Sequence, residues 1–172
     1  MIDNLVALIS KVFDKLPIVE VWRARSSAQV AHDQKKFNEL DNLLPEITLK
    51  HILDDVFHQR IERFALDPID MYLEWAGLSS NKFLIRKIQK SQTQFNTQLR
   101  IFRNFLFSNL FTVREDQGYL YFRPDQDPSR GNTTAEDRKL FDERIVELDR
   151  VIGVCETAYR TFRETIKSHI YI

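Results

Sequence analysis

Residues 81–113 read NKFLIRKIQKSQTQFNTQLRIFRNFLFSNLFTV, and this stretch decides the fold. Its apolar residues alternate spacings of three and four, which places them along one side of an α-helix. At 1.5 Å per residue such a helix is about 50 Å long. We expect its buried edge to consist of Ile85, Ile88, Gln92, Phe95, Leu99, Phe102, Leu106, Asn109 and Val113.

A second edge of the same kind follows in residues 134–170. Thr133, Thr134 and Glu136 form a capping box, which is typical of a helix start. Two long helices joined by one connector, residues 114–132, favour an antiparallel hairpin. The expected buried edge of the second helix consists of Phe141, Ile145, Leu148, Ile152, Cys155, Tyr159, Phe162, Ile166 and His169.

The rest of the chain predicts shorter helices that cover this hairpin. We therefore expect one all-α domain spanning residues 1–172, an antiparallel up-and-down bundle with the connector loop at 114–132. Residues 119–122 are expected to be extended, with a hairpin turn at Gln117 and Gly118. The shorter helices are predicted at residues 2–15, at 18–44 with a kink or break in its polar middle, at 45–64 and at 67–77.

Composition excludes several classes of protein. The only cysteine is Cys155, so no disulfide can form within the chain, and we expect a reducing, cytoplasmic compartment. No apolar run reaches the ~18 residues of a membrane-spanning helix, so we expect no membrane partner. The chain lacks the phosphate-binding, dinucleotide-binding and zinc-protease motifs, so no cofactor is predicted.

Charge is unevenly distributed, although the 25 basic and 25 acidic residues balance. Residues 75–114 contain seven basic residues and no acidic ones, whereas residues 115–149 contain ten acidic and five basic residues. We expect most of the basic charge to pair with acidic residues that fold back beside it, or with a partner helix. The alternative is contact with nucleic-acid phosphates through Arg86, Lys90, Arg100 and Arg103.

His51, Asp55 and His58 lie on one stripe of the predicted third helix, at spacings of four and three. Imidazole and carboxylate groups at these spacings can share a metal ion. The stripe lies opposite the apolar face of the same helix, so we expect it to face water and predict no metal site. Burial of this face in an oligomer would make the three residues candidate ligands.

Near the C-terminus, Arg163 and His169 are separated by five residues. This spacing resembles the arginine–histidine signature of HEPN-type ribonucleases, helical bundles that are often dimeric and common in bacterial toxin and antiphage defence systems. The resemblance implies metal-independent RNA cleavage, with Arg163 binding phosphate and His169 transferring a proton. Glu164 departs from the small polar residue that the family usually has after the arginine.

The function we expect is that of a non-enzymatic helical protein–protein interaction module: a subunit, adaptor, immunity or regulatory protein. Its partner is another protein or a second copy in a homodimer. Tyr119, Tyr121 and Phe122 are candidate partner-binding residues because aromatic side chains are favoured anchors at interfaces. The alternatives are a HEPN-type ribonuclease or its inactive relative, and nucleic-acid binding through residues 81–114.

Overall fold

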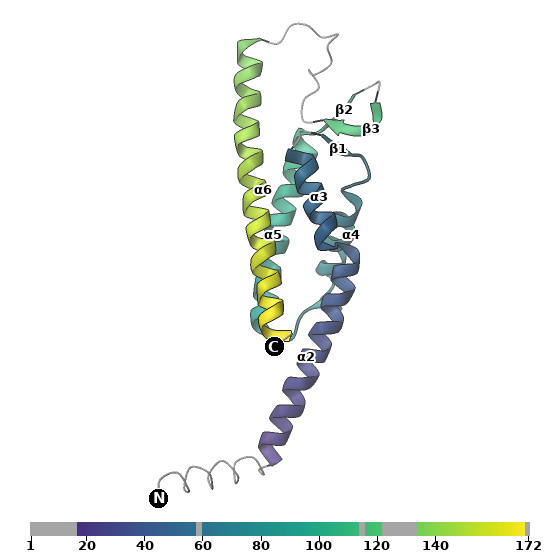
Figure 1. The fold of residues 1–172 in the computed structure, drawn as a ribbon, viewed down its shortest axis with the longest axis vertical. Coiled ribbons are helices and arrows are strands. Elements are labelled where there is room, and N and C mark those ends of the chain that lie inside the picture. The colour runs from purple at the N-terminus through teal and green to yellow at the C-terminus, as the bar shows by residue number, and fades with distance from the viewer. Residues whose placement is uncertain (1–16, 58–59, 114–115, 122–133, 171–172) are drawn as a thin grey trace, which may run out of the picture.

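The computed structural model describes residues 17–57, 60–113, 116–121 and 134–170 (Figure 1). These residues form the all-α helical bundle that the sequence predicts. The predicted helix at 2–15 lies outside the described residues. The elements are α2 (Pro17–Leu43), α3 (Glu46–Phe57), β1 (Arg60–Glu62), α4 (Asp67–Gly77), η1 (Ser79–Asn81), α5 (Arg86–Asn109), β2 (Phe111–Val113), β3 (Asp116–Tyr121) and α6 (Ala135–Ile170).

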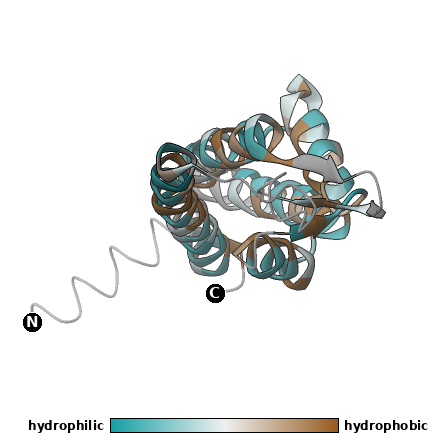
Figure 2. Cartoon of the chain, turned by 90° about the horizontal axis from the view of Figure 1, so that it is seen from above, coloured by the Kyte–Doolittle hydropathy of each residue, from teal (hydrophilic) through white to brown (hydrophobic). Residues whose placement is uncertain are grey.

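The two longest C-terminal helices, α5 and α6, lie side by side and run in opposite directions (Figure 1). Seen from above, the helices stand around a common interior (Figure 2). The predicted edge of α5 is buried from Ile88 to Leu106, as is most of the predicted edge of α6 from Leu148 to Ile166. The antiparallel hairpin is therefore confirmed.

Phe95 lies at the centre of the core and joins α5 to α4 and α6. Its ring centroid is 5.5 Å from that of Tyr72, 5.1 Å from Tyr159 and 6.1 Å from Phe162. The ring of Phe162 also contacts that of Phe37 in α2, at 6.3 Å. Aromatic pairs at these distances stabilise a core beyond the area they bury.

Asp33 explains why α5 begins later than its apolar pattern suggests. This fully buried carboxylate of α2 accepts hydrogen bonds from the backbone N–H groups of Leu84, at 2.7 Å, and Ile85, at 2.8 Å. It therefore holds extended backbone just before α5 and places a negative charge at the positive end of the helix. Of the kink or break predicted in the polar middle of α2, a break is ruled out, because the helix continues from Pro17 to Leu43.

A small antiparallel sheet in the order β1–β3–β2 covers one end of the bundle. Residues 60–62, predicted as the end of a helix, form β1, in which the buried Ile61 lies opposite Leu120 of β3. Gln117 and Gly118 lie within β3 and not at a hairpin turn as predicted. Pairing with β3 thus overrides the helical periodicity of residues 60–62.

The first half of α2 extends past the end of the bundle at which α6 finishes (Figure 1). Arg25, Ser26, Ser27 and Ala28 are all exposed there. No described helix has a stretch that is both long and apolar enough to span a membrane.

Candidate functional site

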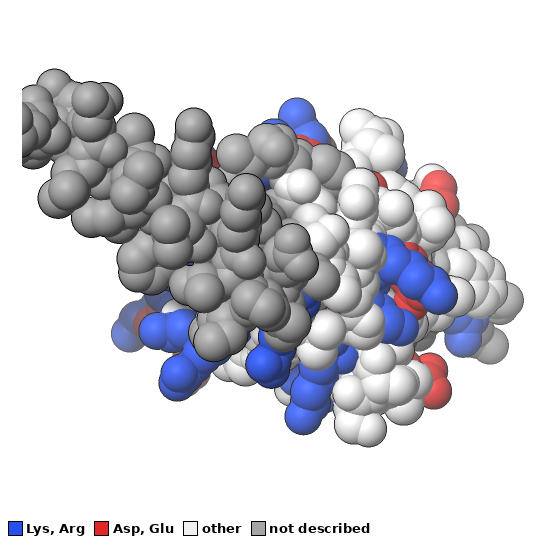
Figure 3. Space-filling view, turned by 90° about the horizontal axis from the view of Figure 1, so that it is seen from below, with Lys and Arg blue, Asp and Glu red and all other residues white. Residues whose placement is uncertain are grey.

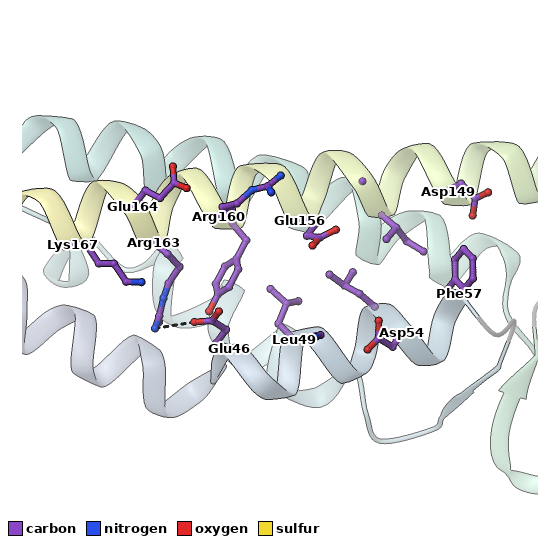
Figure 4. A pocket seen from close by; sticks show the side chains of 15 residues that line it. Glu46, Leu49, Asp54, Phe57, Asp149, Glu156, Arg160, Arg163, Glu164 and Lys167 are labelled. Carbon is purple, nitrogen blue, oxygen red and sulfur yellow. Dashed lines mark ion pairs between the residues drawn. The ribbon is translucent and has the colours of Figure 1, made fainter.

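A groove runs between α3 and α6, which pass each other in opposite directions. It has a volume of about 530 Å³. Its floor consists largely of Leu49 and Leu53 from α3 and Ile152 and Tyr159 from α6. We call this feature the α3–α6 groove. Charged side chains form its rim and face one another across it (Figure 4).

Charge along the rim differs between the two ends of the groove. Asp149 and Phe57 lie at one end, and Arg163 and Lys167 at the other (Figure 4). The exposed carboxylates Asp54, Asp149 and Glu156 have no ion pair with any described cation. The same is true of the exposed cations Lys50, Arg160 and Lys167. The rim therefore offers unpaired charges of both signs to a ligand.

Arg163 closes the basic end of the groove and ties three helices together. Its guanidinium pairs with Asp41 of α2 and, at 3.2 Å, with Glu46 of α3. The same group lies 4.8 Å from the ring centroid of Phe37, within the range of a cation–π contact. The guanidinium to which the ribonuclease resemblance assigns phosphate binding is thus already ion-paired with two carboxylates.

His169, the second residue of that resemblance, lies half-buried near the end of α6. Its Nδ1 is 2.9 Å from the carbonyl oxygen of Thr165 and 2.8 Å from Oγ of Ser168. Six positions on a helix correspond to a rotation of about 120° away from Arg163. Arg163 and His169 therefore lie on different faces of α6, and their side chains do not point toward each other within one copy of the chain.

Tyr159 lies in the floor of the α3–α6 groove and is the tyrosine that lines it. The side chain is buried, and its hydroxyl has no hydrogen-bond partner within the part of the chain that the structure describes. Burial raises the pKa of Tyr159 to about 12, although the nearby Arg163 opposes this shift. Tyr159 is therefore a neutral phenol at neutral pH.

Cys155 lies one turn before Tyr159 and is fully buried. Burial, with a smaller contribution from the charge of Glu156, raises the pKa of its thiol to about 12. A thiol with such a pKa is almost entirely protonated at neutral pH and is a poor nucleophile.

The predicted metal stripe lies on the exposed side of α3. His51 and Asp55 are both exposed, whereas Leu49, Ile52, Leu53 and Val56 on the same helix are buried. His58 lies outside the described residues. Among the residues described, no three potential ligands are close enough to share an ion.

The predicted aromatic anchors belong to the sheet. Tyr119 and Tyr121 are half-buried in β3, where the guanidinium of Arg60 lies 5.4 Å from the ring centroid of Tyr119. Phe122 lies outside the described residues. Among the aromatic side chains whose exposure the structure describes, the most exposed is instead Phe64, at 74%. Phe64 lies in a turn between β1 and α4, because the helix predicted at 45–64 ends at Phe57.

The predicted nucleic-acid contacts divide into two groups. Arg86, Lys90 and Arg100 are exposed on α5 and have no ion pair with a described residue. Arg103 instead donates two hydrogen bonds to Asp70 of α4, at 2.7 and 3.1 Å.

Sequence reasoning did not find the α3–α6 groove. Asp54, Asp149, Glu156 and Arg160 look like ordinary surface charges in the sequence, and they face one groove only because α3 and α6 cross the bundle as neighbours. Comparison of the chain with models of known protein families, with curated proteins and with solved structures found no match.

Proposed function

We propose that this chain is a non-enzymatic helical protein–protein interaction module and that the α3–α6 groove is its binding site. The observation that carries the proposal is the groove itself: an apolar floor between two helices, with unpaired charges along its rim. Proteins repeatedly bind an amphipathic helix in such a groove, with the apolar face of that helix on the floor.

The occupant we propose is an amphipathic helix of another protein. Its length is set by α6, on which Asp149 and Lys167 are 18 residues and hence about 27 Å apart. Basic residues at one end of the incoming helix would face Asp54, Asp149 and Glu156. Acidic residues at its other end would face Arg160 and Lys167. Such complementarity fixes the direction and register of a partner.

The groups around the groove favour binding over catalysis. Its unpaired rim residues are solvent-exposed carboxylates and cations. The thiol of Cys155 is buried and protonated, and the guanidinium of Arg163 is held by two carboxylates.

Photo-crosslinking tests the proposal, with two phenylalanines as matched positions. Phe57 lines the groove and is 59% exposed, whereas Phe107 lies on α5 outside the groove and is 58% exposed. A benzophenone amino acid would replace each phenylalanine in turn, in cells that naturally produce the protein. After illumination, the crosslinked peptides would be identified by mass spectrometry. We expect the Phe57 variant alone to capture a peptide with helical apolar periodicity.

Gly153 supplies the blocking variant and its control. A Cβ atom added there meets nothing within 4 Å, so Gly153→Trp would fill the groove and Gly153→Ala would leave it open. The Phe57 adduct should disappear with Gly153→Trp and persist with Gly153→Ala. An adduct that survives Gly153→Trp, equal adducts from Phe57 and Phe107, or no adduct would overturn the proposal. Capture of a second copy of this chain would replace the proposed occupant with a homodimer.

A further inference from the structure

The outer face of α5 carries a row of cations that form no ion pair with any described residue. Arg86, Lys90, Thr93, Thr97 and Arg100 form this face, which we call the cationic row. All five side chains are exposed. At 100° per residue they lie within about 40° of one line, and the row is about 21 Å long.

No described acidic residue of α6 forms an ion pair with the row. Glu143 lies 3.9 Å from Lys139, and Glu147 lies 2.6 Å from Arg150, so both pair within α6. The one ion pair of α5 in the described chain joins Arg103 to Asp70 of α4. The helix itself contains no acidic residue from Arg86 to Asn109.

The basic character extends around the end of the bundle at which α5 begins. Viewed from that end, Lys and Arg side chains predominate over Asp and Glu on the surface that the undescribed atoms leave visible (Figure 3). Lys82 precedes Arg86 by four positions and Lys87 follows it directly. Both are exposed and have no ion pair with a described residue. A neutral protein thus has one strongly positive region.

We propose that the cationic row binds the phosphate backbone of duplex nucleic acid without reading its sequence. A duplex carries one charge per ~1.7 Å of its axis when both strands are counted, so the ~21 Å length of the row spans about 12 phosphates, of which only those on the facing side are within reach. The guanidinium and ammonium groups of Arg86, Lys90 and Arg100 contact those phosphates. The threonine hydroxyls donate to the carbonyl oxygens of Gln89 and Thr93 in their own helix, so the cations carry the binding.

The composition of the row favours this ligand over two others. A protein interface needs a buried apolar centre, and no large apolar side chain lies on the line from Arg86 to Arg100. Single-stranded nucleic acid is bound largely by stacking bases on aromatic rings, and the row contains none. A straight row of exposed cations matches the regularly spaced phosphates along the backbone of a duplex.

The salt dependence of binding tests this proposal quantitatively. Three phosphate contacts give a slope of log K against log salt of about −2.7, so affinity should fall about 40-fold between 50 and 200 mM KCl. Arg86→Ala with Lys90→Ala leaves one contact and reduces that fall to about 3-fold. Fluorescence anisotropy with a labelled 20-base-pair duplex of mixed sequence, made as DNA and as RNA, measures both values.

Arg138→Ala with Lys139→Ala is the matched control, because it removes two exposed cations from α6 and keeps the cationic row. We expect this control to bind with the unaltered slope. The proposal is overturned by a dissociation constant above about 100 µM at 50 mM KCl, the weak limit of nonspecific binding. A slope that the α5 double variant leaves unchanged would also overturn it. Equal competition by polyglutamate of the same charge would identify an acidic polypeptide as the ligand instead.

Discussion

Replacing Asp33 by alanine should destabilise the bundle more than any other single charge removal from α2. The carboxylate is fully buried and accepts two backbone hydrogen bonds, of 2.7 and 2.8 Å, at the start of α5. A hydrogen bond to a charged group contributes about 1.5–3 kcal/mol. We take the lower value for each bond because Leu84 is half exposed and water can reach its backbone.

The expected loss is therefore about 3 kcal/mol in the free energy of unfolding, which lowers Tm by about 6–12 °C for a chain of this size. Asp33→Asn should lose about half as much, because the amide keeps one acceptor oxygen. Urea denaturation followed by circular dichroism measures both, and Asp55→Ala, an exposed position on α3, is the control. A loss below about 1 kcal/mol with an unchanged m value would refute the idea that Asp33 holds the start of α5.

Three further predictions concern α6. Gly153→Ala should raise the free energy of unfolding by about 0.5–1 kcal/mol, because an added Cβ meets nothing and glycine is costly inside a helix; chemical denaturation checks this. Stability should fall as pH rises above about 9, since Cys155 and Tyr159 ionise in the unfolded chain before their folded pKa values of about 12. The difference between the denaturation midpoints at pH 8 and 11 should become smaller for Cys155→Ala with Tyr159→Phe, but it should not vanish, because burial also raises the pKa of Tyr72. His169→Ala should leave RNA degradation by the purified chain unchanged, whereas a loss of cleavage would support the ribonuclease alternative.

The sequence predicts the fold wherever local periodicity and long-range packing agree. The edge from Ile88 to Leu106 is apolar at helical spacing and is buried by α6, so both the helix and its buried side could be identified. The prediction from local periodicity fails where contact with a residue far away in the sequence determines the secondary structure. The start of α5 depends on Asp33, about 50 positions earlier, and the strand around Ile61 depends on pairing with Leu120.

The candidate sites show the same division. The exposure of Arg86, Lys90 and Arg100 follows from the helix pattern alone, but the sequence does not show which carboxylates come near them. Among the described residues, none forms an ion pair with these three cations. The α3–α6 groove has no local signal, because it arises from the space between two helices that lie about 100 positions apart in the chain.

The most direct test of the proposed binding site is the reactivity of a cysteine placed at Gly153, in the α3–α6 groove. In the purified chain this thiol should react rapidly with a maleimide, while the buried Cys155 stays unmodified. In cells that naturally produce the protein, we expect labelling at position 153 to slow at least about 10-fold relative to a cysteine at Phe107, which is exposed and lies outside both the groove and the cationic row. A 10-fold difference corresponds to ~1.4 kcal/mol of protection. Equal relative rates in the cell and in the purified chain would contradict occupation of the groove by a partner.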